Sequence, residues 1–477
     1  MKTLIIPPFP EGLGKAGDAE KLRKQGDEPH AACEEGVRLS PCWRVFADGQ
    51  EVPVYVTPVT RGGPHSFACL RWAGDEKLLI EAESDREITS AEVLPESYAI
   101  KAEHSRRRVR FETARTGHVT LLVNGGIEKP LTLSILPVRE EKTPAQVRGL
   151  YFGPGVHSIN VFDFDDGDTI YLADGAVVTA LPPPPDEKPT RECDWAKQRN
   201  YRTCICAEGK KHLRIEGGGI LDFSLLAWHE RSPVAFRNCE DVCVRDAALV
   251  NAPAWNLCFS GCSNVAAEFV RIFGYRENSD GIDIVSTEQA RVDDCFLRTG
   301  DDAVVVKAML LPPRVGGRDI RCRRCVVWND KVRCLGIAAE SRNDISDVYF
   351  GDCDVIRSYA DWTLELGALV VYISDKAHVS NVVFEDIRIE HEVHLATHVM
   401  VTKDFWSRDE AAGSISGVTF RNIKVKPAVG SRLAGYDAEH TVERVTYENY
   451  SVAGRRARTP EEAMLEICAH VKDTAVI

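Results

Sequence analysis

The sequence predicts an all-β protein, a right-handed parallel β-helix preceded by an N-terminal β-sandwich. Two observations predict the β-helix: short strand-like segments recur along most of the chain, and no helical period separates them. A third observation, short strands separated by turns before the recurring segments, predicts the sandwich.

The recurring segments share a short motif such as Ser346-Asp347-Val348, in which a polar residue precedes an apolar one. The apolar position recurs at 242, 265, 290, 320, 348, 382, 418 and 445, in steps of 23, 25, 30, 28, 34, 36 and 27 residues. Such steps suit a solenoid whose coils stack about 4.8 Å apart. Leucine-rich and helical solenoids are the structural alternatives, but their consensus is absent.

Three domains follow from this pattern. We expect residues 1–145 to form the β-sandwich and residues 146–455 to form the β-helix. In the segment Thr459-Pro460-Glu461-Glu462, a threonine cap precedes a proline at the first helical position, and a glutamate follows the cap by three residues. We therefore expect a helical tail over residues 456–477.

Composition narrows the class of partner and the compartment. With 72 acidic and 59 basic residues the net charge is -13, so nucleic acid and membrane are unfavourable partners. The N-terminus lacks the apolar core of about 7 to 15 residues that a signal peptide has. We expect a cytoplasmic protein, or a secreted one if an export signal has been removed. The oligomeric state cannot be predicted.

The sixteen cysteines are expected to be mostly buried thiols in a reducing compartment. Cys322 and Cys325, and likewise Cys239 and Cys243, have spacings that could hold a metal. Because alternate positions on a strand point to opposite faces, we predict no metal site and no cofactor.

Three aspartates form the candidate catalytic group. Asp280 is followed 21 and 22 residues later by Asp301 and Asp302, an interval close to one coil. Adjoining strands lie about 5 Å apart, so the three carboxyls should meet. Carboxyl groups roughly 6.5 to 9.5 Å apart suit inverting glycoside hydrolysis, and crowding should keep one of them protonated. The alternative is that these aspartates only cap turns.

The segments Asn278-Ser279-Asp280-Gly281-Ile282-Asp283-Ile284 and Gly300-Asp301-Asp302-Ala303-Val304-Val305-Val306-Lys307 resemble the active-site motifs of polygalacturonases and of the related dextranase and isopullulanase group. The resemblance spans about residues 171–425 and implies a β-helix fold and inverting hydrolysis. It implies that Asp301 is the general acid and that Asp280 and Asp302 activate water.

Within the same motifs, Asn278, Asp283 and Lys307 are candidate substrate-binding residues. Lys307 could instead lower the pKa of a carboxyl, or be a solvated lysine at a strand edge. Trp255 lies 25 residues before Asp280, about one coil upstream, where it could stack on a sugar ring or pack in the core.

The chain departs from polygalacturonases in the next coils. Where they carry Gly-His-Gly, it reads Val332-Arg333-Cys334, and Arg333 becomes a further candidate for substrate binding. Where they carry Arg-Ile-Lys, residues 368–373 contain no basic side chain. Residues 326–330 and the preceding sandwich look closer to the dextranase group, which favours a neutral poly- or oligosaccharide as substrate.

Two other function classes remain open. One is a polysaccharide lyase, in which clustered carboxylates bind calcium and a basic residue abstracts a proton. The other is a non-catalytic β-helix that binds carbohydrate. Inserted loops, one of them at residues 403–413 with Trp406, are expected to build the rim of a binding site.

Overall fold

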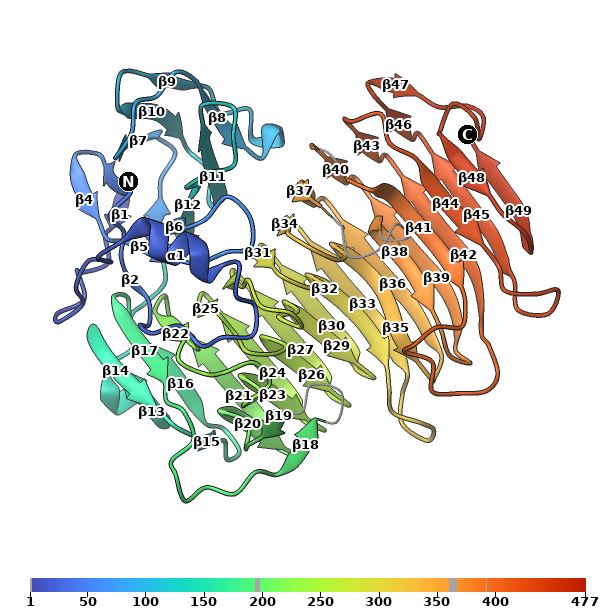
Figure 1. Cartoon of the computed structure of the whole chain (residues 1–477), viewed down its shortest axis with the longest axis horizontal. Helices are drawn as coiled ribbons and strands as arrows, with labels where there is room; N and C mark the ends of the chain where they lie inside the picture. The colour runs from blue at the N-terminus through green and yellow to red at the C-terminus, as the bar shows by residue number, and fades with distance from the viewer. Residues whose placement is uncertain (1, 194–197, 360–366, 392) are drawn as a thin grey trace.

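The computed structural model describes residues 2–193, 198–359, 367–391 and 393–477. Across these residues, a right-handed parallel β-helix carries a separate group of N-terminal strands on its side, which confirms the predicted fold class (Figure 1). None of the described helices is long and apolar enough to span a bilayer.

The β-helix has three long sheets, to which successive coils contribute one strand each. Sheet 1 contains β13 (Gly149–Phe152), β16 (Thr169–Leu172), β21 (Lys211–Glu216), β24 (Glu240–Arg245), β27 (Ser263–Glu268), β30 (Glu288–Asp293), β33 (Gly317–Arg323), β36 (Ile345–Gly351), β39 (His378–Glu385), β42 (Ser414–Arg421), β45 (Val442–Glu448) and β49 (Val471–Val476). Sheet 2 contains β14 (Gly155–Ile159), β17 (Ala176–Ala180), β22 (Ile220–Asp222), β25 (Ala248–Val250), β28 (Arg271–Phe273), β31 (Phe296–Thr299), β34 (Val326–Asn329), β37 (Asp354–Ser358), β40 (Arg388–Ile389), β43 (Lys424–Val425), β46 (Ser451–Val452) and β47 (Arg455–Arg456).

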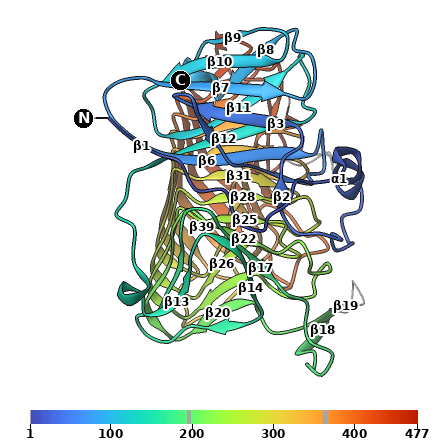
Figure 2. The same cartoon turned by 90° about the vertical axis from the view of Figure 1, so that its left-hand side faces the viewer.

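Sheet 3 carries the candidate functional site on its outer face. It contains β15 (Phe162–Asp163), β20 (Ile205–Glu208), β23 (Val234–Arg237), β26 (Leu257–Ser260), β29 (Ile282–Val285), β32 (Val304–Ala308), β35 (Leu335–Ser341), β38 (Gly367–Ile373), β41 (Leu395–Val401), β44 (Ser431–Ala434) and β48 (Leu465–Ile467). A hairpin of β18 (Arg191–Cys193) and β19 (Gln198–Asn200) projects from an early coil (Figure 2).

The motif found in the sequence marks one corner of each coil. The residue before each recurring apolar position has a positive φ, for example 55° at Asp241, 58° at Asp347 and 53° at Asn381. Asp and Asn tolerate this left-handed conformation better than most residues do. The next residue then turns inward, and like side chains stack, as Phe350, Phe384 and Phe420 do with ring centroids 5.0 Å apart.

The N-terminal strands form two sheets that share a core. The first contains β1 (Thr3–Ile5), β2 (Arg38–Leu39), β5 (Val54–Thr57), β6 (His65–Ala73), β8 (Ala91–Leu94), β11 (Gly117–Val123) and β12 (Leu131–Pro137). The second contains β3 (Trp43–Ala47), β4 (Gln50–Val52), β7 (Leu78–Ser84), β9 (Ala102–His104) and β10 (Arg108–Thr113). The helical turns are α1 (Ala19–Gln25) and two 3-10 turns, Glu96–Tyr98 and Pro144–Gln146.

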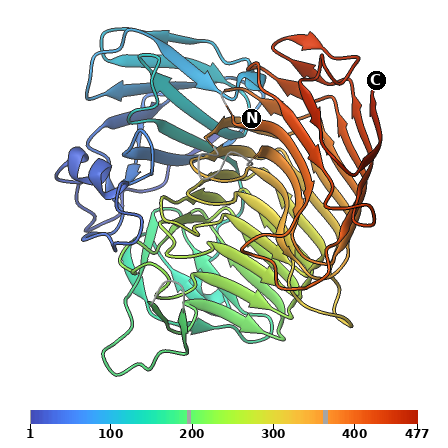
Figure 3. The same ribbon diagram turned by 45° about the vertical axis from the view of Figure 1, so that its right-hand side comes forward.

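The N-terminal strands pack along the outer face of sheet 2 (Figure 3). Phe67 lies 4.5 Å from Phe273, ring to ring, within an apolar cluster that both parts share. Buried Arg71 donates to Asp174 and Asp246, each at 2.8 Å. Sheet 2 is thus covered, whereas sheet 3 leaves part of its outer face open for a site. The boundary near residue 145 stays a prediction.

The predicted C-terminal helix is wrong. Thr459 does cap a turn, since the Glu462 N–H donates to its Oγ1 at 3.3 Å, but the turn ends at Met464. The chain continues into β48 and β49, which pair with β44 and β45. The alternating residues of β49 add a strand to an open sheet edge, and this pairing outweighs the local helical signal.

The reason given for excluding a metal at Cys322 and Cys325 is also wrong. Their sulfurs lie 3.7 Å apart inside the β-helix because the corner at Arg324, with a φ of 55°, turns Cys325 inward as well. Cys353 joins them on the next coil. Burial raises the pKa of the Cys353 thiol, which favours the protonated form rather than the thiolate that binds metal.

Candidate active site

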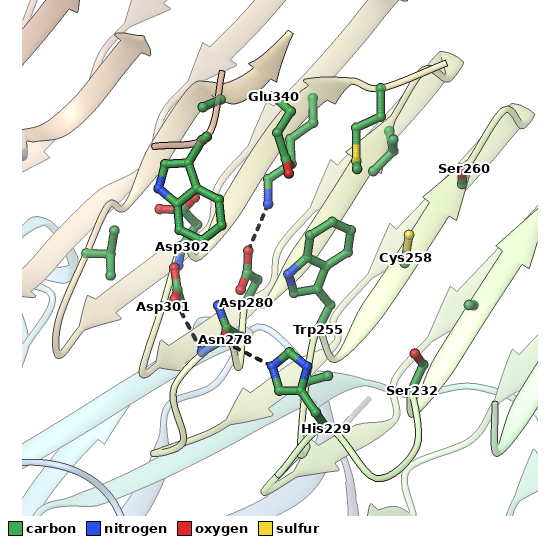
Figure 4. A pocket seen from close by; sticks show the side chains of 18 of the residues that line it. His229, Ser232, Trp255, Cys258, Ser260, Asn278, Asp280, Asp301, Asp302 and Glu340 are labelled. Carbon is green, nitrogen blue, oxygen red and sulfur yellow. Dashed lines mark hydrogen bonds and ion pairs between the residues drawn. The ribbon is translucent and has the colours of Figure 1, made fainter. Parts of the chain in front are cut away.

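The candidate site is a pocket of about 870 Å³ on the outer face of sheet 3. Strands β23, β26, β32 and β35 and the loops before them line it. Inward residues such as Ile282 and Ile284 fill the core, so the alternate positions, among them Asp283 and Val285, point outward. Figure 4 shows the carboxyls of Asp280, Asp301 and Asp302 gathered in this pocket.

The strand register explains this meeting. Ile282 pairs with Val304, and the Gly281 N–H donates to the Asp302 carbonyl at 2.8 Å, so Asp280 and Asp302 occupy equivalent positions on adjoining coils. The next coil continues the row with Arg333, because the Ala303 N–H donates to its carbonyl at 2.9 Å. Two carboxyls and one guanidinium therefore stack along one edge of the pocket.

The three carboxyls approach closely, with one oxygen of each within 4.8 Å of the others. The expected separation of roughly 6.5 to 9.5 Å refers to whole carboxyl groups, and the nearest oxygens lie closer than that. Closest approach alone therefore does not decide between inverting and retaining chemistry. The anomeric configuration of the product distinguishes inverting from retaining chemistry.

Asp301 is held by backbone donors. The Asp302 N–H donates to Oδ1 at 2.8 Å, and the Asn278 N–H donates to Oδ2 at 3.3 Å. The Asn278 side chain in turn contacts His229, at 3.0 Å between Oδ1 and Nε2. Asn278 has a φ of 57°, and this turn aims its N–H at the acid. Asn278 also lines the pocket, so its predicted role in substrate binding stays a prediction.

Asp302 is paired with Arg333. One guanidinium nitrogen, Nη1, lies 3.2 and 3.3 Å from the two carboxylate oxygens of Asp302. The guanidinium also lies 5.1 Å from the centre of the Tyr372 ring. Both Arg333 and Asp302 line the pocket, so the pair faces any substrate.

Lys307 is buried, with 5% of its surface exposed. Its Nζ lies 3.1 Å from Oδ2 of Asp280, 3.2 Å from Oδ1 of Asp283 and 4.0 Å from the centre of the Trp255 ring. The interpretation of Lys307 as a solvated strand-edge residue is therefore wrong. Its ammonium group is the counter-charge of a buried carboxyl cluster.

The pKa shifts follow from burial and crowding. Burial, and then the charges of Asp280 and Asp302, raise the pKa of Asp301 well above its usual range. Burial raises the pKa of Asp280, while Lys307 opposes that rise. Burial raises the pKa of Asp283 to about 7, again opposed by Lys307. Near neutral pH the cluster therefore holds protons on some of its carboxyls.

The structure brings most of the predicted site residues together. The pocket is lined by seven of them: Asn278, Trp255, Lys307, Arg333, Asp280, Asp301 and Asp302. Asp283 is the exception: it is fully buried beneath Lys307, and it is absent from the described lining of the pocket. The prediction that Asp283 binds substrate is wrong, since outward alternation carries its side chain under the lysine rather than into the pocket.

Several pocket residues were missed. Arg237 pairs in register with Ser260, Ser260 with Val285, and Val285 with Lys307. An alignment of the repeats would therefore have placed Arg237 on the same row as Lys307. Glu340 and Arg408 form an ion pair of 3.2 Å at the opposite rim. Trp406 reaches this rim from the inserted loop, as expected.

The acid cluster has the donor type of a site for a hard cation. Lys307 and Arg333 already supply positive charge to Asp280 and Asp302, at 3.1 and 3.2 Å. A divalent ion would have to share these carboxylates with two fixed cations. The donor set therefore disfavours the calcium of a lyase.

Comparisons with known proteins agree with the fold and with the resemblance found in the sequence. Residues 229–454 match the family model described as glycosyl hydrolases family 28. Polygalacturonase QRT2 of Arabidopsis thaliana is 23% identical over 253 residues, which cover 48% of this chain and 54% of that protein. The chain thus spans about half the length of this curated relative.

Two solved structures share the fold. Dex49A from Penicillium minioluteum has a TM-score of 0.63 at 12% identity, covering 99% of this chain and 98% of that one. The family 28 exopolygalacturonase of Yersinia enterocolitica has a TM-score of 0.50 at 11% identity, covering 97% and 99%.

The names of the two polygalacturonases go against the expectation of a neutral glycan. The matched region begins at His229 and contains all of the sequence-predicted site residues. Residues 229–454, which contain the Asp280, Asp301 and Asp302 cluster, are the part of the chain that resembles glycosyl hydrolases family 28.

Proposed function

We propose that this chain is an inverting glycoside hydrolase that cleaves a galacturonate-containing poly- or oligosaccharide. The observation that carries the proposal is the row of Asp280 and Asp302 on adjoining coils, with the carboxyl of Asp301 close beside them. The family match and the names of the relatives support the reaction class and the substrate class.

In this mechanism Asp301 is the general acid. Its raised pKa keeps a proton on the carboxyl near neutral pH, and the pocket exposes it to a glycosidic oxygen. Transfer of that proton neutralises the leaving oxygen as the bond to the anomeric carbon breaks. Asn278 holds the carboxyl through its backbone N–H.

Asp280 and Asp302 orient and deprotonate the attacking water. Oδ1 of Asp280 is buried and has no hydrogen-bond partner among the described residues, so it can accept a proton from a water in the pocket. Lys307 and Arg333 balance the negative charges of the two carboxylates. The water attacks the face of the sugar opposite the leaving group, and the anomeric configuration inverts.

Basic side chains line the pocket, and Arg237, which has no carboxylate partner among the described residues, supports an acidic substrate. Although residues 368–373 carry no basic side chain, other strands and loops supply Arg237, Lys307, Lys331, Arg333 and Arg408 to the lining. The neutral-glycan expectation rested on missing polygalacturonase motifs and on the likeness to the dextranase group, and it did not count Arg237, Lys331 and Arg408.

A substrate panel tests this function. Purified protein is incubated with polygalacturonate, dextran and pullulan, and new reducing ends are measured. We expect hydrolysis of polygalacturonate and little of the neutral glycans. No hydrolysis of any of them, or release of an unsaturated product absorbing in the ultraviolet, would contradict the proposal.

A further inference from the structure

The five basic side chains that line the pocket differ in whether they are already paired with a carboxylate. Four of them are already paired with carboxylates: Lys307 with Asp280, Lys331 with Glu277, Arg333 with Asp302, and Arg408 with Glu340. Arg237 has no hydrogen bond or ion pair from its side chain to any described residue, and it is exposed. Its guanidinium is the positive charge of this pocket that a ligand can use.

Arg237 lies away from the acids. It ends β23, and the register links it to Ser260, then Val285, then Lys307, one strand at a time. Three strand spacings amount to roughly 14 Å, which is more than one pyranose ring. Arg237 therefore faces a sugar beyond the one whose bond is cleaved.

A second pocket of about 340 Å³ adjoins the first at this point. Three residues line both pockets: Arg237, Asn200 and Ser232. The site pocket thus continues past the acid cluster, and its continuation has Arg237 at the junction. We name this continuation the side pocket.

Asn200 gives an independent sign of a ligand here. It is 8% exposed, and its amide nitrogen Nδ2 has no hydrogen-bond partner in the described structure. A buried donor without a partner costs free energy unless something binds it. The unpaired amide and the unpaired guanidinium are both donors, so their common ligand must accept hydrogen bonds.

Nearby carboxylates do not occupy Arg237. Glu208 is its in-register neighbour on β20, but the Asn238 amide donates to Oε1 of Glu208. Asp163 is paired with Arg202, the other arginine of the side pocket. The guanidinium of Arg237 therefore remains available.

We propose that Arg237, with Asn200 and Ser232, binds the carboxylate of a uronate residue beyond the cleaved one. This inference rests on the proposed function and makes Arg237 a specificity-determining residue. A guanidinium matches a carboxylate in shape and charge, and such charge-assisted bonds are stronger than bonds to a sugar hydroxyl.

The test uses the full chain with Asp301→Asn, which binds without turnover, and isothermal titration with trigalacturonate and with its methyl ester. Adding Arg237→Gln should weaken trigalacturonate binding about tenfold or more and leave the methyl ester nearly unchanged. Asn200→Asp, which offers Arg237 a carboxylate of the protein itself, should also weaken the binding of trigalacturonate. Arg291→Gln, an exposed arginine on β30 away from the pocket, is the matched control.

The outcomes separate this inference from the proposed function. If the unmodified protein hydrolyses polygalacturonate and Arg237→Gln binds trigalacturonate as Arg291→Gln does, the subsite is refuted and the hydrolase stands. If nothing is hydrolysed but trigalacturonate binds through Arg237, the subsite stands and the hydrolase is refuted. Hydrolysis of neutral glycans alone overturns the subsite.

Discussion

Lys307 and Asp280 are 27 residues apart in the sequence and form a buried ion pair of 3.1 Å between Nζ and Oδ2. The same ammonium lies 3.2 Å from Asp283. One cation thus serves two buried carboxyls, and its removal leaves both without a counter-charge. The candidate chemistry of Asp280 depends on this pair.

Replacement of Lys307 by glutamine tests this dependence. We expect the free energy of unfolding at pH 8 to fall by about 3 to 5 kcal/mol, because buried carboxylates lose their partner. At pH 5 the loss should be smaller, since Asp280 and Asp283 can then be neutral. Denaturant unfolding at both pH values measures it, with Lys424→Gln as an exposed control. Equal losses at both pH values would contradict the account.

Asp283 makes stability depend on pH. Its pKa is raised from 3.8 to about 7 in the folded state, so the folded protein binds the proton more tightly than the unfolded chain does. Its contribution to stability is complete below pH 3.8 and is lost as the pH rises to about 7, with a slope of up to about 1.4 kcal/mol per pH unit.

Asp283→Asn should therefore flatten the dependence of the free energy of unfolding on pH over this window. The exposed Asp186→Asn serves as control and should leave the profile of the parent protein unchanged. A profile that keeps its full slope in Asp283→Asn would assign the slope to other groups.

Asp301→Asn should abolish nearly all hydrolysis, by a factor of at least roughly 100, because the amide cannot donate a proton to the leaving oxygen. The melting temperature should not fall, since the amide keeps the shape of the neutral, protonated carboxyl. Initial rates and thermal unfolding check both points. Asp165→Asn, in an exposed aspartate pair outside the pocket, should retain full activity.

A chelator separates hydrolysis from calcium-dependent elimination. Lys307 and Arg333 already balance the acid cluster, so we expect excess EDTA to leave the rate unchanged. Loss of activity that calcium restores would instead favour the lyase. Polygalacturonate cleavage followed by reducing ends and by ultraviolet absorbance checks this.

The sequence was sufficient to predict the coils and the meeting of the aspartates. The motif before each apolar position reflects a corner with positive φ, as at Asp347, and such a corner leaves a local trace in Asp, Asn or Gly. Asp280 and Asp302 are 22 residues apart, the same offset that pairs Ile282 of β29 with Val304 of β32. Their meeting could therefore be predicted from the repeat length alone, without knowledge of tertiary packing.

The sequence-based predictions that failed depend on contacts between distant parts of the chain, which no local sequence pattern encodes. In place of the predicted C-terminal helix, β49 pairs with β45 of the neighbouring coil, a contact between residues that are distant in the sequence. The burial of Asp283 depends on how Lys307 folds back over it. Arg237 was missed because the repeats were aligned on the apolar positions of sheet 1, and not on the row of sheet 3 that links Arg237 to Ser260, Val285 and Lys307.

The anomeric configuration of the first product tests the central claim most directly. Proton NMR of a galacturonan digest, recorded before mutarotation, reports whether the α linkage yields a β or an α reducing end. Asp280 and Asp302 acting on water opposite Asp301 predict the β anomer first, that is, inversion. First appearance of the α anomer would show retention and contradict the assigned roles of all three aspartates.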